Sequence, residues 1–397
     1  MYTNGFMKLQ SNIQLAYCTN VHRGNTWEET FHSLEDQVLQ VRDRVSHETR
    51  YAIGLRLGAS AAHTLFNQNE LLNFQRWLEK NNCYIFTING FPYGDFHGTR
   101  VKEQVYRPDW TTNERLDYTI LLFKILESLL QTGEEGSVSS LPGSFKEFIP
   151  ANSIPSIMFE NLIECSRQIE RIGRAKNLDL HLGLEPEPLG LFETTPETIQ
   201  FFQSMSGLVQ DKDSLLKTVG VNYDCCHLAI QGESAQAGLD SLKESGIRIS
   251  KIHLSSALRV SPTHENLEKL HEFIEEVYLH QVVISESGEV VAKIKDLDLA
   301  LKYAKMKDFK VGDDWRIHFH IPLHASPGNG MMDTREHVLA TLDWLSGNSD
   351  SCKHLEMETY TWEVLPPGLR SSEVVEQIVK EYQWTLHALS ERGFERK

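Results

Sequence analysis

The sequence lacks the features that mark membrane-spanning, secreted and nucleic-acid-binding proteins. No stretch of the 397 residues approaches the roughly 20 apolar residues that cross a bilayer, and no basic segment followed by an apolar one suggests a secretory signal. Basic residues are scarce, with 39 against 55 acidic ones and a net charge of −16, which disfavours binding to a phosphate backbone. We therefore expect a cytoplasmic protein without a membrane span and without nucleic acid as a partner. We expect its partner to be a small-molecule metabolite, and the sequence does not predict the oligomeric state.

Cysteine is also sparse, and its pattern excludes a disulfide-stabilised fold. The six cysteines form no C-x-x-C pair and are spread over a long chain, so we expect reduced thiols. Two of them, Cys225 and Cys226, lie between Asp224 and His227, so one could line a site formed there. Short repeats, low-complexity tracts and a linker between two cores are absent as well.

Strand-like and helix-like segments instead alternate along the chain. Capping pairs such as Thr26 and Glu29 mark the starts of the helices, because a hydroxyl and a carboxylate three residues apart satisfy free backbone N–H groups. The eight predicted strands are residues 13–19, 51–58, 83–90, 178–185, 218–224, 248–255, 315–324 and 354–360. This alternation predicts an α/β protein with a single (β/α)8 TIM-barrel domain over residues 1–397.

Three segments interrupt the regular alternation. Residues 91–110 form a long loop after the third predicted strand, and their aromatic content suggests a wall or lid of a pocket. Residues 133–147 look like a flexible connector. An insertion lies between the sixth and seventh predicted strands, and residues 281–294 within it look like a hairpin with Ser-Gly at its turn.

Potential metal ligands stand at the C-terminal ends of four predicted strands. These residues are Glu185, Asp224, His253 and Glu358. A TIM barrel builds its active site at this end of its strands, so we expect the four side chains to meet. Mixed carboxylate and imidazole ligands favour Mn²⁺ or Zn²⁺, with Mg²⁺ or Co²⁺ as alternatives, over Ca²⁺.

Each of these residues also has a simpler interpretation. A single carboxylate such as Glu185 is more often paired at a strand end, and an isolated strand histidine such as His253 is more often a satisfied core residue. The Asp224–His227 spacing is weak on its own, and the prediction depends on the combination. Glu358 is the better ligand than Glu356 because it lies nearer the strand end, and a buried Glu356 would need a partner.

Further polar residues near the predicted strand ends are candidates for substrate binding. Arg259 could clamp a phosphate or carboxylate in bidentate fashion. His320 shares a strand face with His318, which we expect to point into the barrel. The predicted substrate-binding set is His22, His97, His227, Arg259, His320 and Trp362.

These residues together resemble the xylose-isomerase-like barrels, which include sugar-phosphate isomerases, ketose epimerases and endonuclease IV. In the epimerases a Glu, an Asp with a His three residues later, a His and a Glu surround a divalent ion. The segments LEPEPLGLFET, NYDCCH, KIHLSSALR and LEMETY match this order at Glu185, Asp224, His227, His253 and Glu358. The opening LAYCTNVHRGNTWEE, the 91–110 loop and RIHFHIPLH resemble a particular branch, the Ebo-type metabolite-traffic proteins (EboE-like).

The resemblance implies two functions of different classes. The first is a divalent-metal-dependent isomerase or epimerase acting on a small hydroxy-carbonyl compound, either sugar-like or a secondary metabolite. Glu185 or Glu358 would remove the proton beside the carbonyl, and the opposite carboxylate would return it. The second is an Ebo-type protein that binds or moves a metabolite without turnover. An endonuclease is disfavoured by the net charge of −16.

Overall fold

A barrel of parallel strands forms the centre of the computed structural model, which describes residues 9–46, 49–95, 97, 100–150, 153–328 and 330–395. Within these residues the barrel has eight strands in the spatial order β1-β13-β7-β6-β5-β4-β3-β2. Their bounds are β1 Gln14–Tyr17, β2 Tyr51–Arg56, β3 Cys83–Asn89, β4 Glu135–Ser140, β5 Asp179–Leu184, β6 Val219–Asp224, β7 Ile249–Leu254 and β13 His354–Met357. A bridge between Cys18 and Gly54 brings the first strand beside the second, so the barrel is nearly closed. The predicted (β/α)8 TIM barrel is confirmed.

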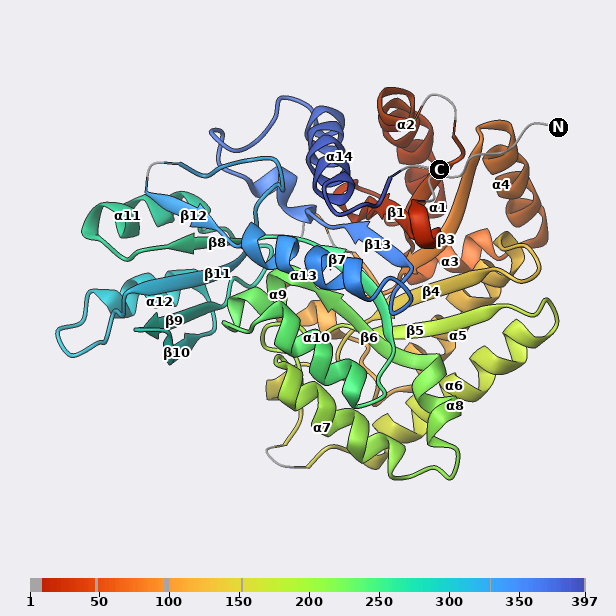
Figure 1. Ribbon diagram of the computed structural model, residues 1–397, viewed down its shortest axis with the longest axis horizontal. Coiled ribbons are helices and arrows are strands. Elements are labelled where there is room, and N and C mark those ends of the chain that lie inside the picture. The colour runs from red at the N-terminus through yellow and green to blue at the C-terminus, as the bar shows by residue number, and fades with distance from the viewer. Residues whose placement is uncertain are drawn as a thin grey trace.

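Helices cover the outside of the barrel, and this is why the strands are buried on both faces (Figure 1). Thr26 and Glu29 form the predicted capping box at the start of α1. The helices around the barrel are α1 Trp27–Ser33, α2 Leu39–Val45, α3 Ala59–Leu65, α4 Gln68–Lys80, α5 Asn113–Leu129, α6 Ser156–Arg174, α7 Thr195–Ser206, α8 Lys212–Thr218, α9 Cys225–Ile230, α10 Ala235–Glu244, α13 Arg335–Gly347 and α14 Val374–Ser390. None of the helices in the described ranges is both long and apolar enough to span a bilayer.

The prediction of a flexible connector at residues 133–147 is wrong, because this segment contains the fourth barrel strand, β4. Its sequence, Glu-Gly-Ser-Val-Ser-Ser, has little of the apolar content typical of a buried strand. Ser137 and Ser139 instead bind Thr87 and Lys251 inside the barrel. The predicted strands at 178–185, 218–224 and 248–255 are therefore the fifth, sixth and seventh.

The prediction that residues 315–324 form a barrel strand is also wrong. This segment contains β11, Asp314–His320, which pairs antiparallel with strands of a second sheet. Its apolar alternation is that of any strand with one buried face, so it could not be told apart from a barrel strand. The two errors compensate each other in the strand count.

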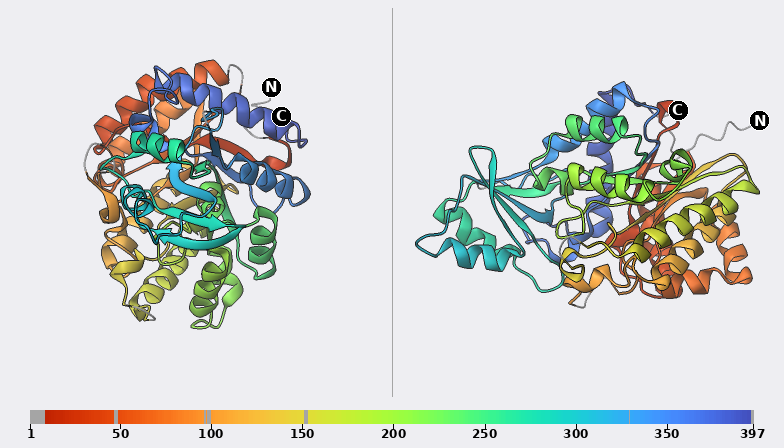
Figure 2. Two further views of the ribbon diagram at one scale, coloured as in Figure 1. Left: turned by 90° about the vertical axis from the view of Figure 1, so that its left-hand side faces the viewer. Right: turned by 90° about the horizontal axis from the view of Figure 1, so that it is seen from below.

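The predicted insertion after the His253 strand is confirmed, and it is larger than the hairpin alone. Its five-stranded sheet has the order β10-β9-β11-β8-β12, with two helices beside it and a separate cluster of buried apolar side chains. The elements are β8 Ala257–Val260, α11 His264–Lys269, β9 Val282–Glu286, β10 Glu289–Ile294, α12 Leu297–Ala304, β11 and β12 Met331–Asp333. The predicted hairpin at 281–294 is the β9–β10 pair. Figure 2 shows that this sheet lies at the end of the barrel where the parallel strands finish.

Candidate active site

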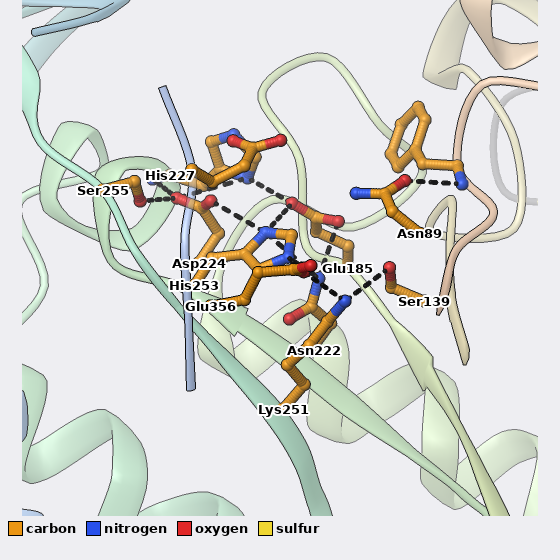
Figure 3. A network of polar contacts seen from close by, with 12 residues as sticks. Asn89, Ser139, Glu185, Asn222, Asp224, His227, Lys251, His253, Ser255 and Glu356 are labelled. Carbon is orange, nitrogen blue, oxygen red and sulfur yellow. Dashed lines mark hydrogen bonds and ion pairs between the residues drawn. The ribbon is translucent and has the colours of Figure 1, made fainter. Parts of the chain in front are cut away.

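Three adjacent barrel strands, β6, β7 and β13, place polar side chains in one row across the barrel interior. Asp224 at the end of β6 lies opposite His253 of β7, and His253 lies opposite Glu356 of β13. Glu185, directly after β5, completes the group (Figure 3). The row is fixed by strand register, because a slip of one residue would turn these side chains to the other face.

His253 is held in one orientation by a chain of buried charges. Its Nε2 donates to Glu356 Oε2 at 2.9 Å, and the same oxygen accepts from Lys251 Nζ at 2.6 Å (Figure 3). Lys251 also donates to Ser139 Oγ at 3.0 Å. Burial acts to raise the pKa of Glu356, but Lys251 and His253 outweigh it and lower that pKa to about 2. Glu356 is therefore a fixed anion that orients the imidazole.

The other nitrogen of His253 faces two carboxylates. Nδ1 lies 3.2 Å from Glu185 Oε1 and 3.4 Å from Asp224 Oδ2. Because Nε2 carries the proton donated to Glu356, Nδ1 of a neutral ring has a lone pair, and three acceptor atoms then converge on one point. Such a set needs a cation among its members, either a proton on Nδ1 or a metal ion.

The electrostatics of this cluster agree with that requirement. Burial acts to lower the pKa of His253, but Glu185 and Asp224 outweigh it and hold the pKa well above its usual value. Ligand atoms of Glu185, Asp224 and His253 all lie within 4.8 Å of one another. Asp224 Oδ2 is buried without a hydrogen-bond partner. A buried set of oxygen and nitrogen donors with an unpartnered oxygen fits a divalent cation.

Glu358, the fourth predicted ligand, lies beside this group rather than within it. Its Oε1 accepts from Asn20 Nδ2 at 2.7 Å, and its Oε2 is buried without a hydrogen-bond partner, 3.3 Å from His320 Nδ1. Burial is the largest cause that raises the pKa of Glu358 to about 8, with Asp224 and Glu185 adding to it and His253 acting against it.

A second ring of side chains surrounds the carboxylates. His227 Nε2 and His318 Nε2 lie 3.1 Å apart, and Glu187 Oε2 lies 3.2 Å from His227 Nδ1. His320 donates from Nδ1 to the backbone oxygen of Glu358 at 3.0 Å, which leaves its buried Nε2 unpartnered. Burial is the largest cause that lowers the pKa of His320 to about 4, so the ring is neutral near pH 7. His318 and His320 lie close together beside Cys226, but their strand belongs to the second sheet, so the prediction that they point into the barrel from one of its own strands is wrong.

Cys225 and Cys226 have different surroundings. Ligand atoms of Cys226, His318 and His320 lie within 4.8 Å of one another, so this thiol belongs to the ring at the mouth. The thiol of Cys225 instead faces Thr341 Oγ1 at 3.6 Å. All six cysteines are free thiols in the structure.

A cavity opens above the carboxylates. Glu185, Glu187, Glu358, His227 and His318 line its polar end, while Asp224 and His253 lie beneath them. The described residues of the predicted 91–110 loop form much of the opposite wall, as expected. The wall residues from this loop are Phe91, Pro92, Val101, Lys102, Val105 and Tyr106.

The predicted substrate-binding residues are not all brought to this cavity. His227 lines it, and His320 lies behind Glu358 with its ring 4.7 Å from the ring of Tyr360. His22 bonds to the Tyr17 hydroxyl at 2.7 Å, and His97 bonds to the backbone oxygen of Asn20 at 2.5 Å, so both lie behind the wall.

The other two predicted residues lie farther from the carboxylates. The guanidinium of Arg259, on β8, binds Asp314 at 2.7 Å and Glu336 at 3.3 Å in and beside the second sheet. It is not among the residues lining the cavity. Trp362 lines an outer groove, where the guanidinium of Arg370 lies 5.6 Å from the centre of its ring.

Sequence reasoning missed several residues that build the site. Lys251 and Asn222 lie two positions before His253 and Asp224, so strand alternation could have placed them on the same face. Asn222 Nδ2 donates to Glu185 Oε2 at 2.8 Å. Ser139 was missed because its strand was not recognised, and Glu187 because it follows two positions after a residue already chosen as a ligand.

No family model and no curated protein matches the chain. Solved structures do resemble it. A D-tagatose 3-epimerase-like protein has a TM-score of 0.50 at 12% identity, over 96% of this chain and 98% of its own. A xylose isomerase domain protein from Alicyclobacillus acidocaldarius has 0.48 at 11%, over 95% and 98%. The IolI protein with a bound zinc atom has 0.47 at 12%, over 95% and 98%. At these identities the likeness concerns the fold alone, which is a (β/α)8 barrel.

Proposed function

We propose that this barrel is a divalent-metal-dependent isomerase or epimerase of a small hydroxy-carbonyl compound. The observation that carries the proposal is the convergence of His253 Nδ1 with the carboxylate oxygens of Glu185 and Asp224, at 3.2 and 3.4 Å. Glu185, Asp224 and His253 would hold the ion, with Glu358 beside them. Mn²⁺ or Zn²⁺ suits these ligands best, and Mg²⁺ or Co²⁺ is the alternative.

When bound, the cation would supply a Lewis acid that makes the hydrogen beside a carbonyl more acidic. The protein's own groups would then move the proton. Glu358 and Glu185 both line the cavity, so a substrate at its polar end lies within reach of both. A buried carboxyl such as Glu358, whose pKa is raised to about 8, can both accept and return a proton near neutral pH. Proton removal by one carboxylate and return by the other would invert or shift the hydroxyl-bearing centre.

Elemental analysis by ICP-MS tests the metal site. We expect about one divalent ion per chain in the purified protein, and its loss in Glu185→Gln and Asp224→Asn. Glu363→Gln is the matched control, because Glu363 binds Arg23 at the surface, with 2.6 Å between the nearest atoms. A wild-type protein that holds no metal after reconstitution with Mn²⁺ or Zn²⁺ contradicts the proposal.

Proton transfer is tested separately from metal binding. Wild type should exchange the carbon-bound hydrogen of a hydroxyketone for deuterium in D₂O, as followed by NMR. Glu358→Gln should keep the metal and lose most of the exchange, by about 10²- to 10⁴-fold, the usual contribution of one acid–base group.

Binding or traffic of a metabolite without turnover, as in the Ebo-type proteins that the sequence resembles, is the second candidate. The apolar wall of the cavity favours it, because such a wall supplies affinity but no proton-transfer group. A ligand that binds wild type and Glu358→Gln equally and is recovered unchanged would support this role. We further propose that the chain is one domain and acts in the cytoplasm, without nucleic acid as partner.

A further inference from the structure

The cavity has two chemically different ends. Carboxylates and histidines lie at the end that faces the barrel. The other end is built from the side chains of Phe91, Val101, Val105, Tyr106 and Leu279. A ligand that fills both ends therefore needs a polar head and an apolar remainder.

We propose that the ligand is a hydroxy-carbonyl compound whose far end is uncharged and apolar, preferably an aromatic ring, rather than a sugar or a sugar phosphate. This inference rests on the proposed function for the position of the head group. The apolar character of the ligand's far end is inferred only from the side chains of the apolar cavity wall.

The apolar wall is held in place by contacts between separate parts of the chain. The backbone N–H groups of Val101 and Lys102 both donate to the backbone oxygen of Val277, at 3.0 and 2.8 Å. Tyr106 packs edge-on against Phe91, with ring centres 5.6 Å apart, and its hydroxyl donates to the backbone oxygen of Pro188 at 3.0 Å. A preformed wall binds an apolar group without the entropic cost of ordering a loop.

None of the described residues that line the cavity offers a free ammonium or guanidinium group to bind a phosphate. Among the described residues that line it, Lys102 is the one with an ammonium or guanidinium group. Its Nζ binds Asp296 Oδ2 at 2.5 Å. Arg259, the predicted anion clamp, binds Asp314 and Glu336 instead.

The side chains of Asn20 and Asn89 also line the cavity, but the wall of Phe91, Val101, Val105, Tyr106 and Leu279 offers few hydrogen-bond partners to the hydroxyl groups of a sugar. The Tyr106 hydroxyl is already bonded to Pro188, and the Tyr278 hydroxyl lies 3.0 Å from His97 Nδ1. A sugar hydroxyl buried against Val101, Val105 and Leu279 would lose its water without gaining a partner, which costs binding free energy.

Three compounds with the same HOCH₂–C(=O)– head test the inference. They are 2-hydroxyacetophenone, dihydroxyacetone and dihydroxyacetone phosphate, which carry a phenyl ring, a hydroxymethyl group and a phosphate at the far end. Isothermal titration calorimetry on the metal-loaded protein should give 2-hydroxyacetophenone an affinity about 10- to 100-fold above that of dihydroxyacetone, as expected for burial of one ring. The phosphate should bind weakest. Equal or tighter binding of either other compound, or no binding by any of the three, overturns the inference.

Two variants connect the preference to the wall. Val105→Asn and Leu279→Gln should each lower the affinity for 2-hydroxyacetophenone several-fold and leave that for dihydroxyacetone within twofold. Ile274→Gln, at a side chain that is 38% exposed and outside the cavity, is the control and should change neither. Loss of both affinities to the same extent in the wall variants would assign the residues a merely structural role and contradict the inference.

The outcome is separable from that of the proposed function. If metal content and deuterium exchange fail but the affinity order holds in the protein as purified, the ligand class stands and the enzymatic role fails. If exchange is observed but the order is reversed, the enzymatic role stands and the ligand class is wrong.

Discussion

At the scale of single residues, the ion pair of Lys251 with Glu356 is the least expected feature of the barrel. Neither side chain is exposed to solvent. A buried pair of this kind contributes little net stability compared with apolar residues, because both charges lose their hydration. Its consequence is orientation, since Glu356 also accepts from His253 Nε2. The pair thus sets which nitrogen of His253 faces Glu185 and Asp224.

Removal of one partner should be costly. Lys251→Met leaves the buried Glu356 carboxylate without its ammonium partner, with His253 Nε2 still bonded to it, and we expect a loss of about 3–5 kcal/mol in the free energy of unfolding, measured by urea denaturation. Lys380→Met removes a half-exposed partner of Glu376 and should cost less than about 1 kcal/mol. A Lys251→Met protein as stable as the control would show that the buried pair is not a structural requirement.

The positions of Glu185, Asp224 and His253 could be predicted from the sequence because each stands where a strand ends, and parallel strands end at one mouth. The partners of these residues could not. Strand alternation predicts that Glu356 is buried, and a buried carboxylate needs a partner. Strand order and register decide that this partner is Lys251 of β7. Arg259 shows that closeness in sequence to a site residue does not predict a place in the site. It follows His253 closely in sequence, yet the chain has already left the barrel for β8, and its side chain lies in the second sheet.

At the scale of elements, the eightfold repeat was predictable and the identity of two strands was not. The polar strand β4 is stabilised by what surrounds it. A Cβ at Gly136 would lie 2.5 Å from Leu130 Cδ1 and 3.0 Å from Leu126 Cδ2, so there is no room for a side chain at this position, and the serines of the strand bond to Thr87 and Lys251. Strand β11 has the apolar alternation of a barrel strand, and only pairing distant in sequence assigns it to the other sheet.

Strand β2 closes the barrel against the site. A Cβ at Gly54 would lie 2.1 Å from Glu356 Oε1 and 2.5 Å from the backbone oxygen of Tyr17. Gly54→Ala should therefore displace Glu356 or open the β1–β2 contact, with a loss of about 1–3 kcal/mol in the free energy of unfolding and weaker metal binding. Gly347→Ala, where no atom lies within 4 Å of the added carbon, is the control and should be near neutral. Unchanged metal binding in Gly54→Ala would show that Glu356 is not needed to orient His253.

Two histidines, His181 and His354, are buried at the opposite end of the barrel, where the strands begin. His354 Nδ1 bonds to Ser137 Oγ at 2.8 Å, and His181 Nε2 bonds to Glu135 Oε1 at 3.0 Å. Burial is the largest cause that lowers the pKa of His354 from 6.5 to about 3, with Glu135 acting against it. Burial likewise lowers the pKa of His181. The His354 ring is therefore neutral in the folded protein and becomes charged on unfolding in mild acid.

Stability should therefore fall as the pH falls. The unfolded chain binds a proton at His354 below about pH 6.5 while the folded protein does not, and this costs about 1.4 kcal/mol per pH unit down to about pH 3. His354→Gln should reduce the slope of unfolding free energy against pH by about that amount, as measured by denaturation at several pH values. His264→Asn, at an exposed position, should leave the slope unchanged. An unaltered slope in His354→Gln would mean that this histidine is not the group responsible.

At the scale of the whole molecule, the barrel and the second sheet meet around one cavity. The carboxylates come from barrel strands, whereas His318 comes from β11 and Leu279 from the segment before β9. The length of the insertion indicated an added element. Its position above the mouth follows from the strand it leaves, since β7 ends at that mouth.

Metal removal should lower the stability of the whole protein if the cluster of Glu185, Asp224 and His253 holds an ion. Binding to the folded state alone adds about 2.7 kcal/mol of stability at a free metal concentration 100 times the dissociation constant. EDTA should lower the melting temperature of wild type, as followed by circular dichroism, and leave that of Asp224→Asn unchanged. An equal effect of EDTA on both proteins would assign the stabilisation to metal bound elsewhere.

The second sheet also separates two properties that many enzymes carry on the same residues. The groups that could move protons belong to the barrel strands, while much of the surface that would contact the rest of a ligand comes from described residues of the 91–110 loop and from the insertion. Substitutions in those two segments can retune ligand preference and leave Lys251, Glu356 and His253 untouched. The chain therefore has the layout of a scaffold on which new specificities can arise, or be engineered, without rebuilding the chemistry beneath them.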